Sequence, residues 1–317
     1  MVVIFLIAFI GFAYLNLESD PKADSTDTNY DERKEVINID KVEKKRQLER
    51  DINDPPKMDA SAVYSFYYEE GEKEILFSLN RHEKLPIASI TKLVTGLIVY
   101  EDYSLNEPVG VADSDYLDQD NFSDLRIFRD TPYRELLYQL LLESNNSSAY
   151  AAAVTPEDIE FDDFVNMMNE RVNELGMSRT FFYNPSGLDN LKGVNYSTAR
   201  DLGVLTVELL DYPKFWEILQ KTEYEIHSNK SDLHYKVETT NKFLDESYFF
   251  KSELPKWHDD ILGGKTGFTH QAMGCLVMVL EVEDGYLVNI ILGAEGRIER
   301  FEEMEKLIDW AYRSYNF

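Results

Sequence analysis

The chain has a single cysteine, Cys275, so it cannot form a disulfide within itself. Cys275 opens the apolar run CLVMVL at residues 275–280, and we therefore expect a packed core thiol rather than a nucleophile. The five histidines show neither His-x-x-x-His nor His-Glu-x-x-His spacing, and the sequence contains no cysteine–histidine cluster. We therefore predict no metal site and no cofactor.

Positive charge is also scarce, with 32 Lys and Arg against 59 Asp and Glu, which gives a formal net charge of −27. A surface of this sign repels phosphates, so a nucleic-acid partner is not expected. Apolar residues, in contrast, are plentiful: 44% of the chain is hydrophobic and 13% is aromatic. Disorder is therefore excluded for most of the 317 residues, which suffice for one large core or for one core with an attached lobe.

Residues 1–17 (MVVIFLIAFIGFAYLNL) are apolar apart from Asn16. As a helix this segment would extend about 25 Å, slightly less than the hydrocarbon core of a bilayer. No Lys or Arg precedes it, and its one weak cleavage signal is Gly11-Phe-Ala13. We predict an uncleaved membrane anchor that holds the rest of the chain outside the cell membrane, with secretion after signal cleavage as the alternative.

The remaining chain divides into a linker and a compact domain. Residues 18–57 are dense in Asp, Glu, Lys and Arg and end at Pro55-Pro56, which indicates a charged spacer. Residues 58–317 form the predicted compact domain. Strand-like runs lie near its start, at residues 61–68 and 74–79 around Gly71, which indicates a hairpin.

A second hairpin is predicted near the end of the domain, at residues 274–282 and 286–292 around Asp284-Gly285. Helical patterns fill the middle: residues 89–100, a helix that starts at Thr131-Pro132 and ends near Glu143, and residues 164–175. The last helix has one apolar stripe, formed by Phe301, Met304, Ile308, Ala311 and Tyr315. We predict a mixed α/β fold of the α+β type, in which both ends form one antiparallel sheet flanked by helices, with an inserted helical lobe.

Three short motifs carry residues suited to nucleophilic chemistry. Ser89 and Lys92 are three residues apart, so a helix would place them on one face, where a neutral lysine amine can take the proton of a serine hydroxyl. Ser144 and Asn146 are two residues apart, so both can reach one site only from a turn. The third motif, Lys265-Thr266-Gly267, lies just upstream of a strand-like run, where it could hold a carboxylate.

Each motif alone is a weak signal, since a helix cap, a polar turn or a glycine-rich loop explains it equally well. As an ordered set they resemble those of the penicillin-recognising serine enzymes, in particular the low-molecular-mass D-alanyl-D-alanine carboxypeptidases. Further stretches carry the same resemblance: LPIASITKLVT at 85–95, NPSGLD at 184–189 and YSTARDL at 196–202. The resemblance extends over about residues 60–315 and implies a β-lactamase/penicillin-binding transpeptidase-like fold.

The resemblance implies a role for each motif residue. Ser89 would attack the carbonyl carbon of the penultimate D-alanine, and Lys92 would accept the serine proton. Ser144 would relay a proton to the leaving D-alanine, while Asn146 would hold the substrate amide. Lys265, Thr266 and Gly267 would bind the terminal carboxylate. The backbone N–H groups of Ser89 and Phe268 would form the oxyanion hole. Peptidoglycan stem peptides would be the substrate, and β-lactams would be covalent inhibitors.

Several positions depart from the family pattern or remain open. Ser147 stands where the family often has Asp, Met273 lies in a segment usually richer in glycine, and His270 could border the cleft, although a surface histidine is expected. A serine β-lactamase would share the three motifs, but Glu170 and Glu174 lie on a predicted helix and look solvated rather than catalytic. The sequence also allows a DD-endopeptidase, which would use the same residues, or a membrane-tethered module that only binds stem peptides.

Overall fold

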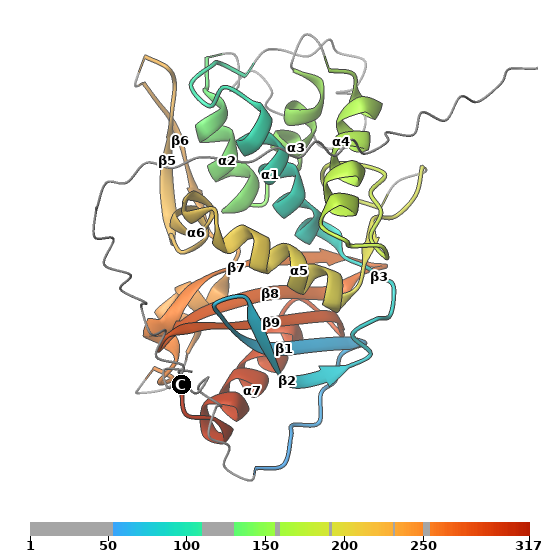
Figure 1. The fold of residues 1–317 in the computed structure, drawn as a ribbon. Coiled ribbons are helices and arrows are strands. Elements are labelled where there is room, and N and C mark those ends of the chain that lie inside the picture. Colours follow the sequence, from blue (N-terminus) through green and yellow to red (C-terminus); the bar gives the residue numbers. More distant parts are fainter. Residues whose placement is uncertain (1–52, 110–129, 156–158, 190–191, 231, 250–253) are drawn as a thin grey trace, which may run out of the picture. The chain divides into compact units, whose positions relative to one another are not determined.

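The computed structural model describes residues 53–109, 130–155, 159–189, 192–230, 232–249 and 254–317 (Figure 1). All of them belong to one compact unit, Gln47–Phe317. The predicted membrane segment at residues 1–17 and most of the predicted linker at 18–57 lie outside the described residues. Within the described part of the chain, no helix is long and apolar enough to cross a membrane.

The centre of the unit is a five-stranded antiparallel sheet in the order β2-β1-β9-β8-β7 (Figure 1). Its strands are β1 (Ala62–Glu69), β2 (Glu72–Leu79), β7 (Ile261–Thr269), β8 (Met273–Val282) and β9 (Gly285–Ala294). β1 pairs with β9, so the start of the domain is joined to its end in the middle of the sheet. This confirms the predicted sheet formed by the two ends, and it leaves β7 as an edge strand.

Helices cover both faces of the sheet. α7 (Glu299–Ser314) packs on one face, where Phe301 and Met304 lie in a buried cluster with strand residues such as Leu276. α5 (Ala199–Leu210) and α6 (Pro213–Leu219) lie on the other face (Figure 1). The predicted apolar stripe of α7 is confirmed, since all five of its members are buried.

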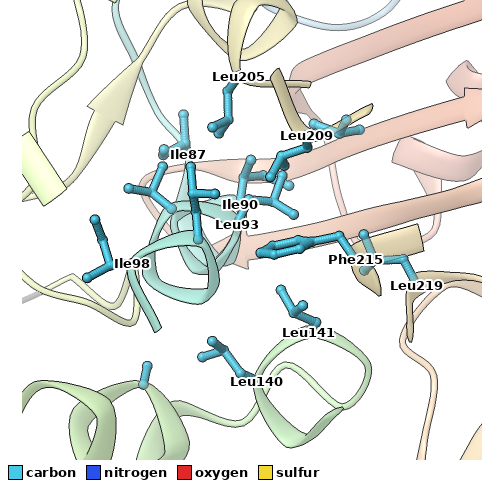
Figure 2. Packing of buried hydrophobic residues seen from close by; sticks show 14 of the residues in the cluster. Ile87, Ile90, Leu93, Ile98, Leu140, Leu141, Leu205, Leu209, Phe215 and Leu219 are labelled. Atoms are coloured by element: carbon cyan, nitrogen blue, oxygen red, sulfur yellow. The ribbon is translucent and has the colours of Figure 1, made fainter. Parts of the chain in front are cut away.

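The inserted lobe consists of α1 (Lys92–Asp102), α2 (Tyr133–Leu141), α3 (Asn146–Val154) and α4 (Phe161–Glu174). α1 is buried on all sides from Lys92 to Val99, because it runs through the middle of the lobe and has no solvent face there. Ile90 and Leu93 pack near Leu209 and Phe215, so the same core holds the lobe and the sheet-covering helices together (Figure 2). This rigid base positions the start of α1.

Three predicted boundaries were wrong in detail. Residues 89–100 do not form one helix: a 3₁₀ turn, η1 (Ala88–Thr91), precedes α1. Pro132 is the N-cap of α2 rather than its first helical residue, because its ψ of 157° is extended. The second hairpin turns at Glu283-Asp284, one residue earlier than predicted, since Val282 pairs with Gly285 and Asp284 has a φ of 64°.

Some elements had no clear sequence signal. β5 (Glu223–His227) and β6 (Leu233–Glu238) form a separate hairpin that the apolar pattern did not indicate. β3 (Leu85–Pro86) and β4 (Tyr196–Ser197) form a two-residue ladder just before η1. The remaining short 3₁₀ helices in the described ranges are η4 (Lys242–Leu244), η5 (Glu246–Tyr248) and η6 (His258–Asp260). Tertiary contacts rather than local propensity stabilise elements this short.

Candidate active site

Ser89 lies in the 3₁₀ turn that leads into α1, and two glycines allow other backbone segments to approach this turn closely. A Cβ on Gly187 would lie 1.9 Å from the carbonyl oxygen of Ala88. A Cβ on Gly267 would lie 3.1 Å from the backbone nitrogen of Ser89. Ala88 itself has a φ of 46°, a left-handed value that costs a non-glycine residue about 1 kcal/mol. The surroundings therefore hold the serine turn in one strained conformation.

Lys92 is fully buried, and its amine reaches three oxygen atoms. Its Nζ lies 2.9 Å from Ser89 Oγ, 2.7 Å from Asn146 Oδ1 and 2.5 Å from the carbonyl oxygen of Ser186. Burial lowers the pKa of Lys92 well below its ordinary value, and the positive charge of Lys265 lowers it further. A neutral amine can donate to two of these oxygens and offer its lone pair to the serine proton.

In the turn at residues 144–146, one asparagine caps α3 and the other bonds Lys92. Asn145 caps α3, because its side chain accepts a hydrogen bond of 3.0 Å from the backbone N–H of Ser148. Asn146 is the first residue of α3 and points its amide oxygen at Lys92. Ser144 has a φ of 64°, so the chain turns sharply there. The structure thus has the turn that the two-residue spacing predicted.

Lys265 approaches the same turn from the edge strand β7. Its Nζ donates a hydrogen bond of 2.7 Å to Ser144 Oγ. Burial, with a smaller contribution from Arg300, lowers the pKa of Lys265 to about 7. The next residue, Thr266, has its Oγ1 2.7 Å from Thr240 Oγ1, so a second hydroxyl stands beside the strand. Among the described residues no strand pairs with the outer side of β7, so an extended ligand could lie along this edge.

These groups border a cleft of about 270 Å³. Six of the eight predicted site residues line it: Ser89, Ser144, Asn146, Thr266, Gly267 and Phe268. The other two, Lys92 and Lys265, are buried beside it and bond to Ser89 and Ser144. All eight predicted residues therefore meet at one place, although they come from η1, α1, the α2–α3 turn, the start of α3 and β7.

Five further residues line the cleft without having been predicted as site residues: Glu143, Leu188, Thr240, Arg297 and Arg300. Arg300 donates a hydrogen bond of 2.6 Å to the carbonyl oxygen of Gly267, and the Arg297 guanidinium lies 4.6 Å from the centre of the Phe268 ring. Both arginines lie at the entry of α7, which the resemblance covered without assigning them a role. Thr240 carried no local signal at all.

The remaining residues singled out from the sequence have simple surroundings. Cys275 is fully buried and burial raises the pKa of its thiol to about 11, which confirms a core thiol. His270 is exposed, with its ring 6.2 Å from that of Phe268. Glu170 and Glu174 are exposed on α4, as predicted. Glu143, which was overlooked, is half-buried at the cleft, and burial raises its pKa.

Comparisons with known proteins identify relatives of this chain. A D-alanyl-D-alanine endopeptidase of Pseudomonas aeruginosa is 29% identical over 239 residues, which cover 75% of this chain and 73% of that protein. The D-alanyl-D-alanine carboxypeptidase DacF of Bacillus subtilis is 26% identical over 248 residues, which cover 76% of this chain. The match spans 60% of the length of the Bacillus protein.

A solved structure shares the fold over most of the chain. Penicillin-binding protein D2 from Listeria monocytogenes, in its cefotaxime-bound form, is 27% identical and matches with a TM-score of 0.67. The match covers 82% of this chain and 100% of that one. A family model described as D-alanyl-D-alanine carboxypeptidase matches residues 51–296. The chain therefore belongs to the peptidase S11 family of D-alanyl-D-alanine carboxypeptidases.

Proposed function

We propose that this chain is a serine-type D-Ala-D-Ala carboxypeptidase that acts on peptidoglycan stem peptides through an acyl-enzyme on Ser89. One observation carries the proposal: the buried amine of Lys92, with a pKa well below its ordinary value, lies 2.9 Å from Ser89 Oγ. A serine hydroxyl needs such a base to become a nucleophile. A lysine that only stabilised the fold would be expected at the surface or in an ion pair.

The reaction has two halves. Ser89 Oγ attacks the carbonyl carbon of the penultimate D-alanine, Lys92 takes the hydroxyl proton, and the oxyanion accepts hydrogen bonds from the backbone N–H groups of Ser89 and Phe268. The proton that Lys92 took then reaches the nitrogen of the leaving D-alanine through Ser144, the C–N bond breaks, and D-alanine leaves with Lys92 neutral again. In the second half, water attacks the ester carbonyl and gives a proton to Lys92. The C–O bond to Ser89 then breaks, and Lys92 returns this proton to Ser89 Oγ, which restores the free enzyme.

The terminal carboxylate of the substrate would lie along β7. In this proposal Lys265 supplies a charge and Thr266 a hydroxyl, while Gly267 lets the substrate backbone lie close to the strand. The amide oxygen of Asn146 faces Lys92, and its amide nitrogen makes no hydrogen bond among the described residues, so that nitrogen could bond the substrate. Ser144 stands between the leaving nitrogen and Lys265, which fits a proton relay.

The test is acylation by a fluorescent penicillin, with Ser89→Ala as the inactive variant and Ser147→Ala as a matched serine control. Wild type and the Ser147 variant should carry a stable label, and the Ser89 variant should carry none. Release of D-alanine from a pentapeptide ending in D-Ala-D-Ala should follow the same order. A folded wild-type protein that neither takes the label nor releases D-alanine would contradict the proposal and favour a module that only binds stem peptides.

Endopeptidase action is the second candidate, because a Pseudomonas relative that is 29% identical is named a D-alanyl-D-alanine endopeptidase. The same residues would cleave a cross-link, in which the leaving nitrogen belongs to another stem peptide. Parallel assays on a pentapeptide and on a cross-linked dimer distinguish the two activities. Faster cleavage of the cross-linked dimer than of the pentapeptide would assign an endopeptidase instead of a carboxypeptidase.

β-Lactamase activity has one observation in its favour, the carboxyl of Glu143 at the cleft. A deacylating base must activate water next to the acyl ester. The lifetime of the penicilloyl adduct tests this role: we expect a long-lived adduct in wild type and the same lifetime in Glu143→Gln. Rapid turnover that Glu143→Gln abolishes would instead assign a β-lactamase.

We further propose that residues 1–17 anchor the chain in the cell membrane and that the catalytic domain faces the wall, since peptidoglycan lies on that side. The apolar composition of the segment supports this placement. Protease added to intact cells should degrade the domain, and the chain should stay in the membrane fraction after a salt wash. A chain recovered from the medium without its first residues would favour signal cleavage.

A further inference from the structure

A group of positive side chains gathers at the free edge of β2, away from the catalytic cleft. Lys73 comes from β2, Arg81 from the loop after it, and Arg200 from the first turn of α5. They line a hollow of about 270 Å³, which we name the cationic pocket. Its lining includes Tyr64, Lys73, Ile75, Arg81, His82 and Arg200. None of these residues lines the catalytic cleft.

The sheet register explains why Lys73 faces this hollow and the neighbouring Glu74 does not. Lys73 lies opposite Tyr68 and Ile75 opposite Phe66, on the sheet face that α5 covers. Glu74 lies opposite Tyr67, so alternation directs it to the other face, which α7 covers. The carboxylate of Glu74 therefore does not face the pocket and does not neutralise Lys73 there.

Aromatic rings hold two of the cations in place. The Lys73 amine lies 5.1 Å from the centre of the Phe66 ring, and the Arg81 guanidinium lies 5.4 Å from that of Tyr64. The two rings are themselves 4.9 Å apart and buried. Cation–π contacts of this kind restrain long side chains, so less entropy is lost when an anion binds them.

The positive charge of the pocket is poorly compensated. Asp201 pairs with Arg200 at 3.1 Å, but it also accepts hydrogen bonds from the backbone N–H of Arg179 and the hydroxyl of Thr180. Within the described part of the chain, Lys73 and Arg81 make no ion pair. Glu83 lines an adjacent hollow of about 480 Å³ that shares Arg81 and His82 with the pocket. Burial lowers the pKa of Lys73, and the charge of Arg200 adds to this effect, as expected for facing cations.

A net charge of −27 makes such a concentration of cations a local exception. Guanidinium groups suit phosphate, because their forked N–H groups match two oxygens at once, and an amine adds a point charge. The hollow of about 270 Å³ has room for one phosphate group. We propose that the cationic pocket is a binding site for a phosphate group, carried by a soluble or polymeric phosphate or by a lipid headgroup.

Titration of the full-length chain in detergent with inorganic pyrophosphate tests the site. Replacing both unpaired cations, K73Q/R81Q, should weaken binding at least about tenfold, because two charged hydrogen-bond donors are lost. The matched control K192Q/K230Q removes the same charge at two exposed lysines elsewhere. It should leave the affinity within about twofold of wild type. If the double variant does not fold, K73Q alone replaces it, with a smaller loss expected.

The outcomes separate specific binding from general attraction and from catalysis. Equal weakening in both double variants, no change in K73Q/R81Q, or no pyrophosphate binding at millimolar concentration would each overturn the site. Acylation by fluorescent penicillin should be the same in all variants, so the result does not depend on the proposed catalytic function. Phosphatidylglycerol in the micelles should weaken pyrophosphate binding, relative to phosphatidylcholine, if a lipid headgroup is the ligand. Unchanged binding would assign a soluble or polymeric phosphate.

Discussion

At the scale of single residues, burial determines what the site can do. Lys92 and Lys265 are both fully buried, and both have lowered pKa values for that reason. A buried amine without a carboxylate partner loses its proton more readily, because the charged form is poorly solvated. Two lysines that look alike in the sequence are thereby given different tasks: one faces Ser89, and the other faces Ser144.

Replacing Lys92 with Arg should abolish acylation, although the side chain stays long and positive. Arginine cannot be deprotonated in a protein, so it cannot take the serine proton. We expect the second-order rate of penicillin acylation to fall about 10²–10⁴-fold, the usual contribution of a general base. A Lys92→Arg variant with a rate close to wild type would show that charge, not basicity, is required.

The pH dependence of binding should report Lys265. Its pKa of about 7 means that it is positive below pH 7 and neutral above it. If its ammonium binds the carboxylate of the substrate, the affinity should be strongest below pH 7 and should weaken as pH rises through that value. KM measured from pH 5 to 9 checks this. Lys265→Arg, which stays charged, should have a flat profile over the range, even if its activity is lower.

Glu143→Gln should stabilise the fold at alkaline pH but not at acidic pH. Burial raises the pKa of this carboxyl, so the folded state binds its proton more tightly than the unfolded state. Below both pKa values the carboxyl is neutral and no penalty arises. Above the folded pKa the carboxyl is ionised while half-buried, which lowers the free energy of unfolding. Glutamine carries no charge at any pH and avoids this loss. Thermal melting should therefore show a rise of about 1–2 °C at pH 8 and none at pH 4.

At the scale of elements, the site depends on the close approach of segments that have little structure of their own. The segment at residues 184–189 lies against η1, and Asn195 links the two with bonds to Thr91 Oγ1 and to the carbonyl oxygen of Asn184. The Ser186 carbonyl then reaches Lys92. A loop, a 3₁₀ turn and a helix start are thus assembled by hydrogen bonds, and glycine at 187 makes the contact sterically feasible.

Two glycine variants separate backbone strain from this contact. Gly187 and Gly176 both have left-handed φ values, +83° and +72°, but a Cβ at Gly176 meets no atom within 4 Å. Gly176→Ala should cost about 1–2 kcal/mol in the free energy of unfolding and leave acylation unchanged. Gly187→Ala should cost about 3 kcal/mol or more and slow acylation, because the Ala88 carbonyl must move. Urea unfolding and penicillin acylation measure both; equal effects would refute the contact argument.

At the scale of the described unit, the sheet joins the first and last strands around the inserted lobe. α7 covers the face remote from the lobe, yet it also carries Arg300 to the cleft. Damage to the core under α7 should therefore reach the active site. We expect the sheet and the lobe to unfold together, because residues of both belong to the same buried cluster.

Phe301→Ala tests this coupling. Phe301 is fully buried, and the centre of its ring lies 5.2 Å from that of Phe243. Removal of the ring should therefore lower the free energy of unfolding by about 3–5 kcal/mol. Penicillin acylation should disappear at the same, lowered temperature as the helical circular dichroism signal. The neighbouring Glu302→Ala, at an exposed position, should change stability by less than about 0.5 kcal/mol. If acylation is lost at a temperature well below that at which the circular dichroism signal disappears, the sheet and the lobe do not unfold as a single cooperative unit.

The sequence by itself determined much of this protein. Alternation and turn residues predicted both hairpins, and helical spacing predicted α4 and the stripe of α7, because these signals are local. The order of Ser89-x-x-Lys92, Ser144-x-Asn146 and Lys265-Thr266-Gly267 predicted the fold family and all eight residues that meet at the site. That prediction rested on resemblance, since each motif alone was ambiguous.

Only the tertiary structure decided which other groups join them. Thr240 and Arg297 reach the cleft from segments that no periodicity connects with the motifs, and β5–β6 pairs without an apolar pattern. Glu143 directly precedes Ser144 in the sequence, but only the packed structure shows that its carboxyl borders the cleft. The lowered pKa values of Lys92 and Lys265 arise from burial, and the cationic pocket arises from the register of β2 against β1. Burial and long-range contacts depend on how distant segments pack, and a local pattern does not contain that information.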